Sequence, residues 1–135
     1  MTGVPERAER IDFYRRYIDC CNQHRFEELG EFVAEDVRGG DGNDGLESYI
    51  AGCQAVVDAF PDYHWDLQHL LVDGDWLAAR LVDTGTHSGT FRGVPATGRR
   101  IRVQELAVYR LENGRIAEVW GDLGSAVRDL LTNGD

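Results

Sequence analysis

Lysine is absent from this chain of 135 residues, and its 14 basic side chains, all of them arginines, are outnumbered by 24 acidic ones. The formal net charge is therefore -10 at pH 7. Such an acidic protein lacks the basic surface with which proteins bind the phosphates of nucleic acids, and anionic membranes repel it for the same reason. The sequence predicts neither nucleic acid nor a membrane as a partner.

Cysteine is scarce, and its spacing fits no metal site. Of the three cysteines, Cys20 and Cys21 are adjacent, a spacing that rarely forms a disulfide, and Cys53 is distant in sequence from both. No pair with the i, i+4 spacing of a helical zinc site occurs among the four histidines, which are His24, His64, His69 and His87. We therefore expect reduced, partly buried thiols, no metal, and a cytoplasmic location.

Long apolar runs and recognisable cofactor motifs are also missing. No run approaches the ~20 apolar residues of a transmembrane helix, and Met1–Arg10 is too polar for a signal peptide. The chain has no G-x-S-x-G nucleophile turn, no phosphate-binding glycine loop and no dinucleotide-binding fingerprint. We expect neither a membrane span nor a cofactor.

Apolar residues make up 42% of the chain, which is enough for a core, and the length suits a single domain over residues 1–135. The first half has helical periodicity, because Ile11, Tyr14 and Ile18 recur at intervals of three and four. The pattern predicts a glycine-rich loop at 38–45 and three helices, over 6–23, over Phe26–Val33, and from near Asp44 to Phe60.

After Pro61 the apolar period changes to two, which is typical of strands. Four strands are predicted, over Tyr63–Val72, Trp76–Thr86, Ile101–Leu111 and Arg115–Asp122. Asn113-Gly114 is a strong hairpin signal, because a type I′ turn needs positive φ at both central residues. Helices followed by an antiparallel meander indicate an α+β domain with helices on one face of the sheet. If the sheet curls, its concave face and the helices enclose a pocket.

Glu105 is the most conspicuous candidate for chemistry. It shares the more apolar face of its strand with residues such as Val103 and Ala107, where a carboxylate is costly unless it is paired, hydrogen-bonded or protonated. Glu105 is therefore either a catalytic group or half of a buried ion pair with an arginine such as Arg80. A one-residue bulge would instead turn it outward.

Further candidates come from the neighbouring strands. Alternation places Asp122 on one face with Ile116, Glu118 and Trp120, either beside the pocket or simply at the end of the strand. His69 shares a face with Trp65, so it is either a catalytic group or a hydrogen-bonded core histidine. The side chains that we expect to bind substrate are Tyr14, Phe60, Trp65, Arg80 and Trp120.

Several segments, in this order and spacing, resemble the SnoaL-like polyketide cyclases of the nuclear-transport-factor-like superfamily. They are Phe60–Asp62, Gly74–Asp75, Gly85–Gly89, Gly93–Arg99, Val108–Arg110 and Gly114–Trp120. The resemblance implies a cone-shaped α+β fold, in which a curved, mostly antiparallel sheet packs on three N-terminal helices around an internal apolar pocket. It also implies a homodimer or homotetramer.

Ring-closing members of that family catalyse an intramolecular aldol condensation of aromatic polyketides without a cofactor. The resemblance implies an aspartate near the end of the last strand as acid/base, helped by a histidine. Many members read His-Trp-Asp where this chain reads Val119-Trp120-Gly121-Asp122, so Asp122 is the nearest carboxylate.

The leading hypothesis is a cofactor-independent cyclase of a small hydrophobic or aromatic substrate, in which Asp122 is the base and Glu105 or His69 the proton donor. A hydroxylase-type tailoring protein is the first alternative, because the His-Trp-Asp pattern is altered. A non-catalytic protein that binds a hydrophobic ligand is the second. Hydrolase or isomerase activity completes the set.

Overall fold

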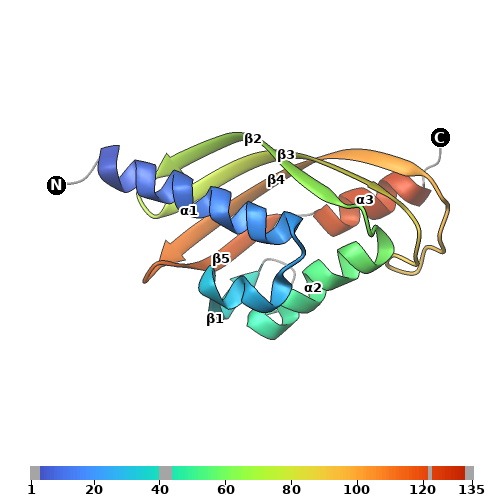
Figure 1. Ribbon diagram of the computed structural model, residues 1–135, viewed down its shortest axis with the longest axis horizontal. Helices are drawn as coiled ribbons and strands as arrows, with labels where there is room; N and C mark the ends of the chain where they lie inside the picture. Colours follow the sequence, from blue (N-terminus) through green and yellow to red (C-terminus); the bar gives the residue numbers. More distant parts are fainter. Residues whose placement is uncertain (1–3, 40–43, 122, 133–135) are drawn as a thin grey trace.

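The chain folds into the α+β architecture that the sequence predicts (Figure 1). The computed structural model describes residues 4–39, 44–121 and 123–132. The elements, in chain order, are α1 (Val4–Asn22), the 3-10 helix η1 (Phe26–Glu31), β1 (Val33–Gly39), α2 (Leu46–Ala59), β2 (His64–Asp73), β3 (Trp76–Thr86), β4 (Arg100–Glu112), β5 (Arg115–Gly121) and α3 (Leu123–Thr132).

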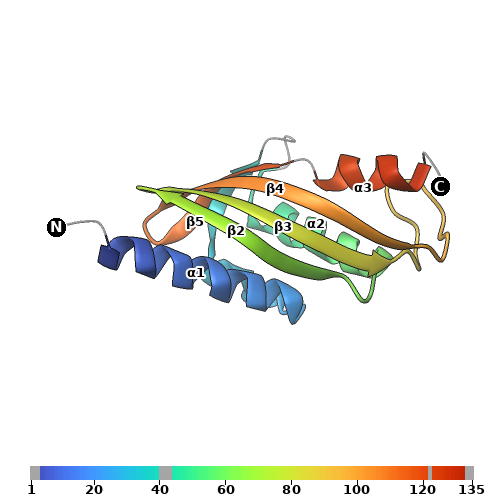
Figure 2. The same cartoon turned by 90° about the horizontal axis from the view of Figure 1, so that it is seen from above.

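The strands form one curved sheet in the order β1-β5-β4-β3-β2 (Figure 2). β1 runs parallel to β5, and every other neighbouring pair is antiparallel. The predicted hairpin between β4 and β5 is present, and Asn113 and Gly114 have φ values of 53° and 77°. Positive φ at both residues is what a type I′ turn requires.

The sequence prediction misses β1, because it extends the second helix to Val33 and begins a loop at residue 38. The buried residues of this strand, Val33 and Val37, are four residues apart, so buried and exposed residues do not alternate along the strand. The strand forms because it pairs with β5, which is distant in sequence, and the Ile116 amide also donates to the Phe32 carbonyl at 2.8 Å. Such a tertiary contact leaves no local sequence signal.

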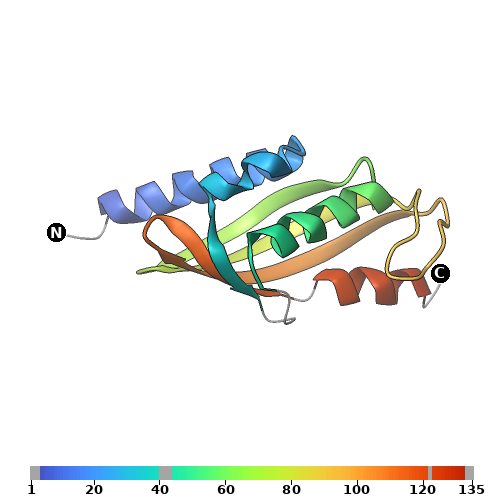
Figure 3. The ribbon, with the colours of Figure 1, turned by 90° about the horizontal axis from the view of Figure 1, so that it is seen from below.

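The helices surround the strands on several sides. Figure 2 shows α1 and α3 on opposite sides of the strands, and Figure 3 shows α2 near β1 and η1, which it contacts. Within β4, only residues 107–112 pair with β5. The helix α3 packs beside the rest of β4 and buries Val127 and Leu131. No helix in the described ranges is both long enough and apolar enough to cross a membrane.

Alternating burial along β3 divides the sheet into two faces, which we call inner and outer. The inner face packs against the helical part of the core and carries the buried residues Leu77, Ala79, Leu81, Asp83 and Gly85 of β3. Their pairing partners on β4 are Tyr109, Ala107, Glu105, Val103 and Ile101. Glu105 therefore lies on the inner face, as predicted.

A bulge in β2 reverses the orientation of His69. The register with β3 shifts between Leu67 and His69, and a bulge of this kind moves the following side chains to the other face. Beyond it, Leu70 is half-buried, whereas His69 and Leu71 are exposed. The prediction that His69 points inward with Trp65 is therefore wrong.

A second irregularity reverses the end of β5. Leu111 pairs with Ile116 but Arg110 pairs with Glu118, so Ala117 is the extra residue. Ile116 is fully buried, whereas Trp120, which pairs with the outer-face residue Val108, is 50% exposed. The predicted common face of Ile116 and Trp120 is therefore wrong, and Trp120 lies on the outer face.

Candidate active site

Two carboxyl groups lie on the inner face of the two central long strands. Asp83 of β3 is fully buried. Glu105 of β4 pairs with Leu81, two residues before Asp83, so the two acids are diagonal neighbours across the strands. Diagonal neighbours are within reach of one another when one side chain is long, and the two side chains are within hydrogen-bonding reach here.

The hydrogen bonds of this pair are incomplete. The Tyr63 hydroxyl donates to Oδ2 of Asp83 at 3.0 Å. Oδ1 of Asp83 and Oε1 of Glu105 are both buried, and neither has a donor among the described residues. Buried polar atoms without a partner are uncommon in folded proteins and often mark a functional site.

Burial makes both carboxyl groups weak acids. It raises the pKa of Glu105 well above its usual range, and the neighbouring Asp83 raises it further. The Trp65 side chain, which can donate to Glu105, opposes this rise. Burial also raises the pKa of Asp83, while the neighbouring Glu105 side chain and the hydrogen bond from Tyr63 lower it. The pair therefore keeps a proton to higher pH than ordinary carboxyl groups do.

Phenols and thiols surround the carboxyl groups. The Tyr14 hydroxyl shares a 2.9 Å hydrogen bond with that of Tyr109, and burial raises the pKa of both phenols. Burial, followed by the charge of Glu105, raises the pKa of Cys53 to about 12. This cysteine is therefore a neutral thiol at physiological pH, not a nucleophilic thiolate.

His87 is a second buried polar group, at the end of β3 beyond Gly85. The ring is fully buried and stacks on Phe60 at a centroid distance of 5.2 Å. Its Nδ1 accepts from the Thr97 amide at 3.2 Å, so Nε2 carries the proton of the neutral ring. Nε2 is buried and has no partner among the described residues.

A groove of about 480 Å³ opens between α1 and β2. Trp65 lines this groove and also lies beside Glu105. Its ring is 8% exposed and contacts the Tyr63 ring edge-on at 4.7 Å. Trp65 thus separates the groove from the carboxyl pair.

The candidates from the sequence divide into three groups. Those buried or directed to the inner side are Glu105, Tyr14, Phe60 and Trp65. Those on the outer face are His69, Arg80 and Trp120. Asp122 lies outside the described residues.

The predicted ion pair between Glu105 and Arg80 does not form. Arg80 Nε donates to His69 Nδ1 at 3.1 Å and its Nη1 to Gln104 at 2.9 Å, both on the outer face. Glu105 and Arg80 lie on adjacent strands but on opposite faces of the sheet, because Glu105 pairs with Leu81 and Leu106 pairs with Arg80. No arginine neutralises Glu105 in the part of the chain that the structure describes.

The sequence analysis overlooks Asp83 and Tyr63, although one signal was available. Leu77, Ala79 and Leu81 alternate along their strand, and Asp83 continues that apolar series.

The described residues contain no cluster of three or more histidine, cysteine, aspartate or glutamate side chains that suits a metal ion.

Comparisons with known proteins match most of the chain. A family model described as SnoaL-like polyketide cyclase matches residues 11–130. The chain is 26% identical over 132 residues to the aklanonic acid methyl ester cyclase DnrD of Streptomyces peucetius. This match covers 91% of each protein.

Solved structures agree with the family match. A SnoaL-like polyketide cyclase from Agrobacterium tumefaciens is similar with a TM-score of 0.77 and 32% identity, over 89% of this chain and 95% of that one. TsrD from Streptomyces laurentii is similar with a TM-score of 0.83 and 25% identity, over 93% and 96%.

Proposed function

Because the chain belongs to the SnoaL-like polyketide cyclase family, we propose that it closes a ring in a small polyketide by a cofactor-independent aldol reaction. In such a reaction a base removes a proton from a carbon beside carbonyl groups. The resulting enolate carbon attacks a ketone of the same molecule, and an acid protonates the new alkoxide.

The observation that carries the proposal is the Glu105 carboxyl on the inner face, a half-buried residue whose Oε1 is fully buried. Its raised pKa lets it keep a proton to higher pH than an exposed glutamate does, and it can donate that proton as the alkoxide forms. Aromatic side chains beside it, including Trp65 and Tyr14, suit a planar, carbonyl-rich substrate. The sequence predicts Asp122 as one candidate for the base.

The names of the curated relatives suggest a first substrate. Two of them are named aklanonic acid methyl ester cyclases, so the test substrates are that methyl ester and simpler aromatic β-keto esters. Ring closure by aldol addition gives a product of unchanged mass, whereas hydroxylation adds an oxygen and consumes dioxygen. A protein that only binds its ligand gives no product.

Replacing Glu105 tests the proposal directly. We expect Glu105→Gln to lower kcat by at least ~10²-fold, because the amide cannot donate a carboxyl proton. Glu35→Gln is the matched control, since Glu35 is exposed on β1. Full activity of Glu105→Gln, or a product heavier by one oxygen, would contradict the proposed function.

We also propose that two copies associate through the outer face. Its exposed apolar side chains are Leu71, Trp76, Leu106, Val108 and Trp120. Leu71, Ala78, Val108 and Trp120 form one row across four strands. Singly exposed apolar residues are common, but a contiguous patch of this kind favours an interface.

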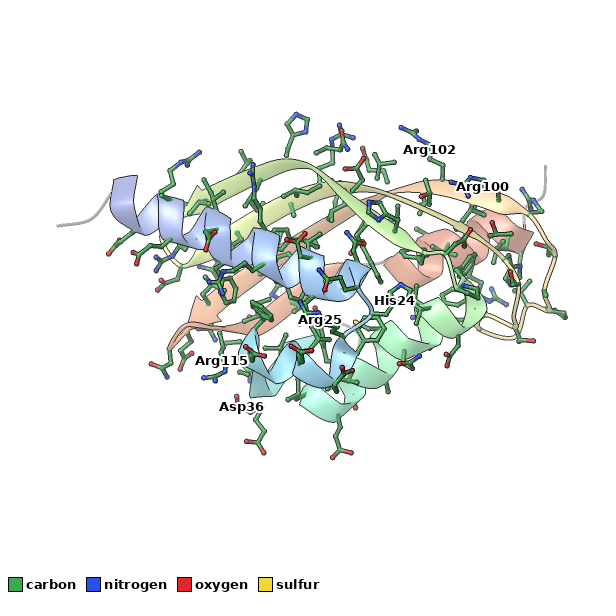
Figure 4. The ribbon with its side chains drawn as sticks, viewed as in Figure 1. His24, Arg25, Asp36, Arg100, Arg102 and Arg115 are labelled. Carbon is green, nitrogen blue, oxygen red and sulfur yellow. The ribbon has the colours of Figure 1, made fainter. Side chains whose placement is uncertain are left out.

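The charges around the patch favour a second copy as the partner. On one side of the apolar row, Asp73, Glu112 and Glu118 outnumber Arg110, which pairs with both glutamates. On the other side, Arg80 and Arg102 outnumber Asp66. Figure 4 shows Arg100 and Arg102 directed away from the helices. A two-fold axis across the strands would bring the acidic side of each copy to the basic side of the other.

A further inference from the structure

We propose that Asp83 and Glu105 act as one acid/base unit, which holds a single proton between them and supplies both the base and the acid for ring closure. This inference rests on the proposed function. It makes Asp83 a second catalytic residue and Tyr63 a positioning residue that orients it.

The numbers of hydrogen-bond donors and acceptors at the pair favour a shared proton. An ionised carboxylate only accepts hydrogen bonds, whereas a protonated one also donates. Tyr63 supplies one donor, to Oδ2 of Asp83, and Oδ1 of Asp83 and Oε1 of Glu105 are buried without one. One proton held between the two side chains would supply a donor to these unpaired oxygens.

Electrostatic repulsion between the two carboxyl groups also favours a shared proton. Two adjacent buried carboxyl groups rarely ionise together, because each negative charge disfavours the other and water is excluded. The titratable groups that face the pair come from α1, α2, β2, β4 and the segment just before β2, and they are Tyr14, Cys21, Cys53, Tyr63, His64 and Tyr109. Only His64 among them can become a cation, and it is exposed. A pair that keeps a proton is therefore favoured over a doubly ionised pair.

The described part of β5, the strand on which the sequence predicts the base, carries no acid on the inner face. The described part of this strand presents Val119 and Gly121 toward the inner-face residues Tyr109 and Ala107. Neither side chain can transfer a proton. In its described part, β5 therefore offers the inner face no acid/base group besides the carboxyl pair of β3 and β4.

The proposed step balances without a co-reactant. The ionised member of the pair takes a proton from a carbon between two carbonyl groups, and the C–H electrons become the enolate. The enolate carbon bonds to the ketone carbon of the same molecule, and the π electrons of that ketone move to its oxygen. That oxygen takes the proton of the other member. The pair gains one proton and loses one, so it ends as it began, and the product is an isomer of the substrate.

The shared proton can be tested in the wild-type protein without substrate, by NMR titration with carboxyl-labelled aspartate and glutamate. We expect Asp83 and Glu105 to titrate in two coupled steps separated by more than about one pH unit. Independent titration of both groups at their ordinary pKa values would overturn the inference, whether or not the protein closes rings.

The catalytic part is tested by kinetics. We expect Asp83→Asn and Glu105→Gln each to lower kcat by at least ~10²-fold, and the double variant to be little worse than either, because residues that act as a unit are not additive. Asp36→Asn is the control, since Asp36 is exposed on β1 (Figure 4). Circular dichroism checks that each variant is folded.

The outcome that would overturn this role is specific. If Asp83→Asn keeps kcat within about threefold of wild type while Asp122→Asn loses ~10²-fold or more, then Asp122 is the base and the pair is not. If the wild type closes no ring, the proposed function fails, and the NMR titration still decides whether the proton is shared.

Discussion

At the scale of single residues, the buried carboxyl groups link stability to pH. Their pKa values are raised above 3.8 for Asp83 and above 4.5 for Glu105. The folded protein therefore retains protons that the unfolded chain has already released. Their contribution to stability is complete below these ordinary values and is lost as pH rises toward the pKa values of the folded state.

We accordingly expect the free energy of unfolding to fall as pH rises above about 4.5, by at most about 1.4 kcal/mol per pH unit for each retained proton. Glu105→Gln should flatten this slope, because the amide does not titrate. Urea denaturation at a series of pH values measures it. A slope that Glu105→Gln leaves unchanged would mean that other groups cause the dependence.

The same residues show how far sequence reasoning extends at this scale. Glu105 was predicted to face inward because it interrupts an apolar alternation, and β4 is regular through that residue. His69 was misplaced because the β2 bulge lies immediately before it. No residue type near His69 signals a bulge, whereas a regular strand needs no further information.

At the scale of elements, the approach of β3 to the end of α2 depends on Gly85. A Cβ at this position would lie 3.1 Å from Tyr63 Cδ1 and 3.2 Å from Phe60 Cβ. Both rings are buried, so they cannot move aside without disturbing the core. This contact fixes the spacing between the strand that carries Asp83 and the residues that follow α2.

We expect Gly85→Ala to destabilise the protein by about 1–3 kcal/mol, as overpacking of a core does. Thermal or urea unfolding measures the change.

Gly52→Ala is the matched control. Gly52 lies within α2, and a Cβ there would meet nothing within 4 Å. Because alanine is the better helix former, this variant should gain about 0.5–1 kcal/mol. Equal effects of the two alanines would show that the close approach at Gly85 carries no cost.

At the scale of the whole molecule, the sheet has two faces with different roles. The inner face meets the helices and holds the carboxyl pair, while the outer face exposes an apolar patch that includes Leu106 (61% exposed) and the apolar row with Trp120. If two copies cover this row, each leaves its own inner face unchanged.

Self-association predicts a molar mass twice that of the 15.1 kDa chain, measured by light scattering after size exclusion. Leu106→Glu should shift the mass toward that of one chain, because it places a charge in the exposed apolar patch of the outer face. Ala55→Glu, on the exposed side of α2, should not. A wild-type protein that elutes as one chain at micromolar concentration would contradict the proposed interface.

The sequence by itself determined the α+β class, four of the strands, the Asn113-Gly114 turn and the inward position of Glu105. Each of these follows from local periodicity or from the backbone preferences of single residues. Only the tertiary structure decided the parallel pairing of β1, the outward orientation of His69 and Trp120, and the meeting of Asp83 with Glu105. These depend on strand register and bulges, which are set by contacts between segments distant in sequence.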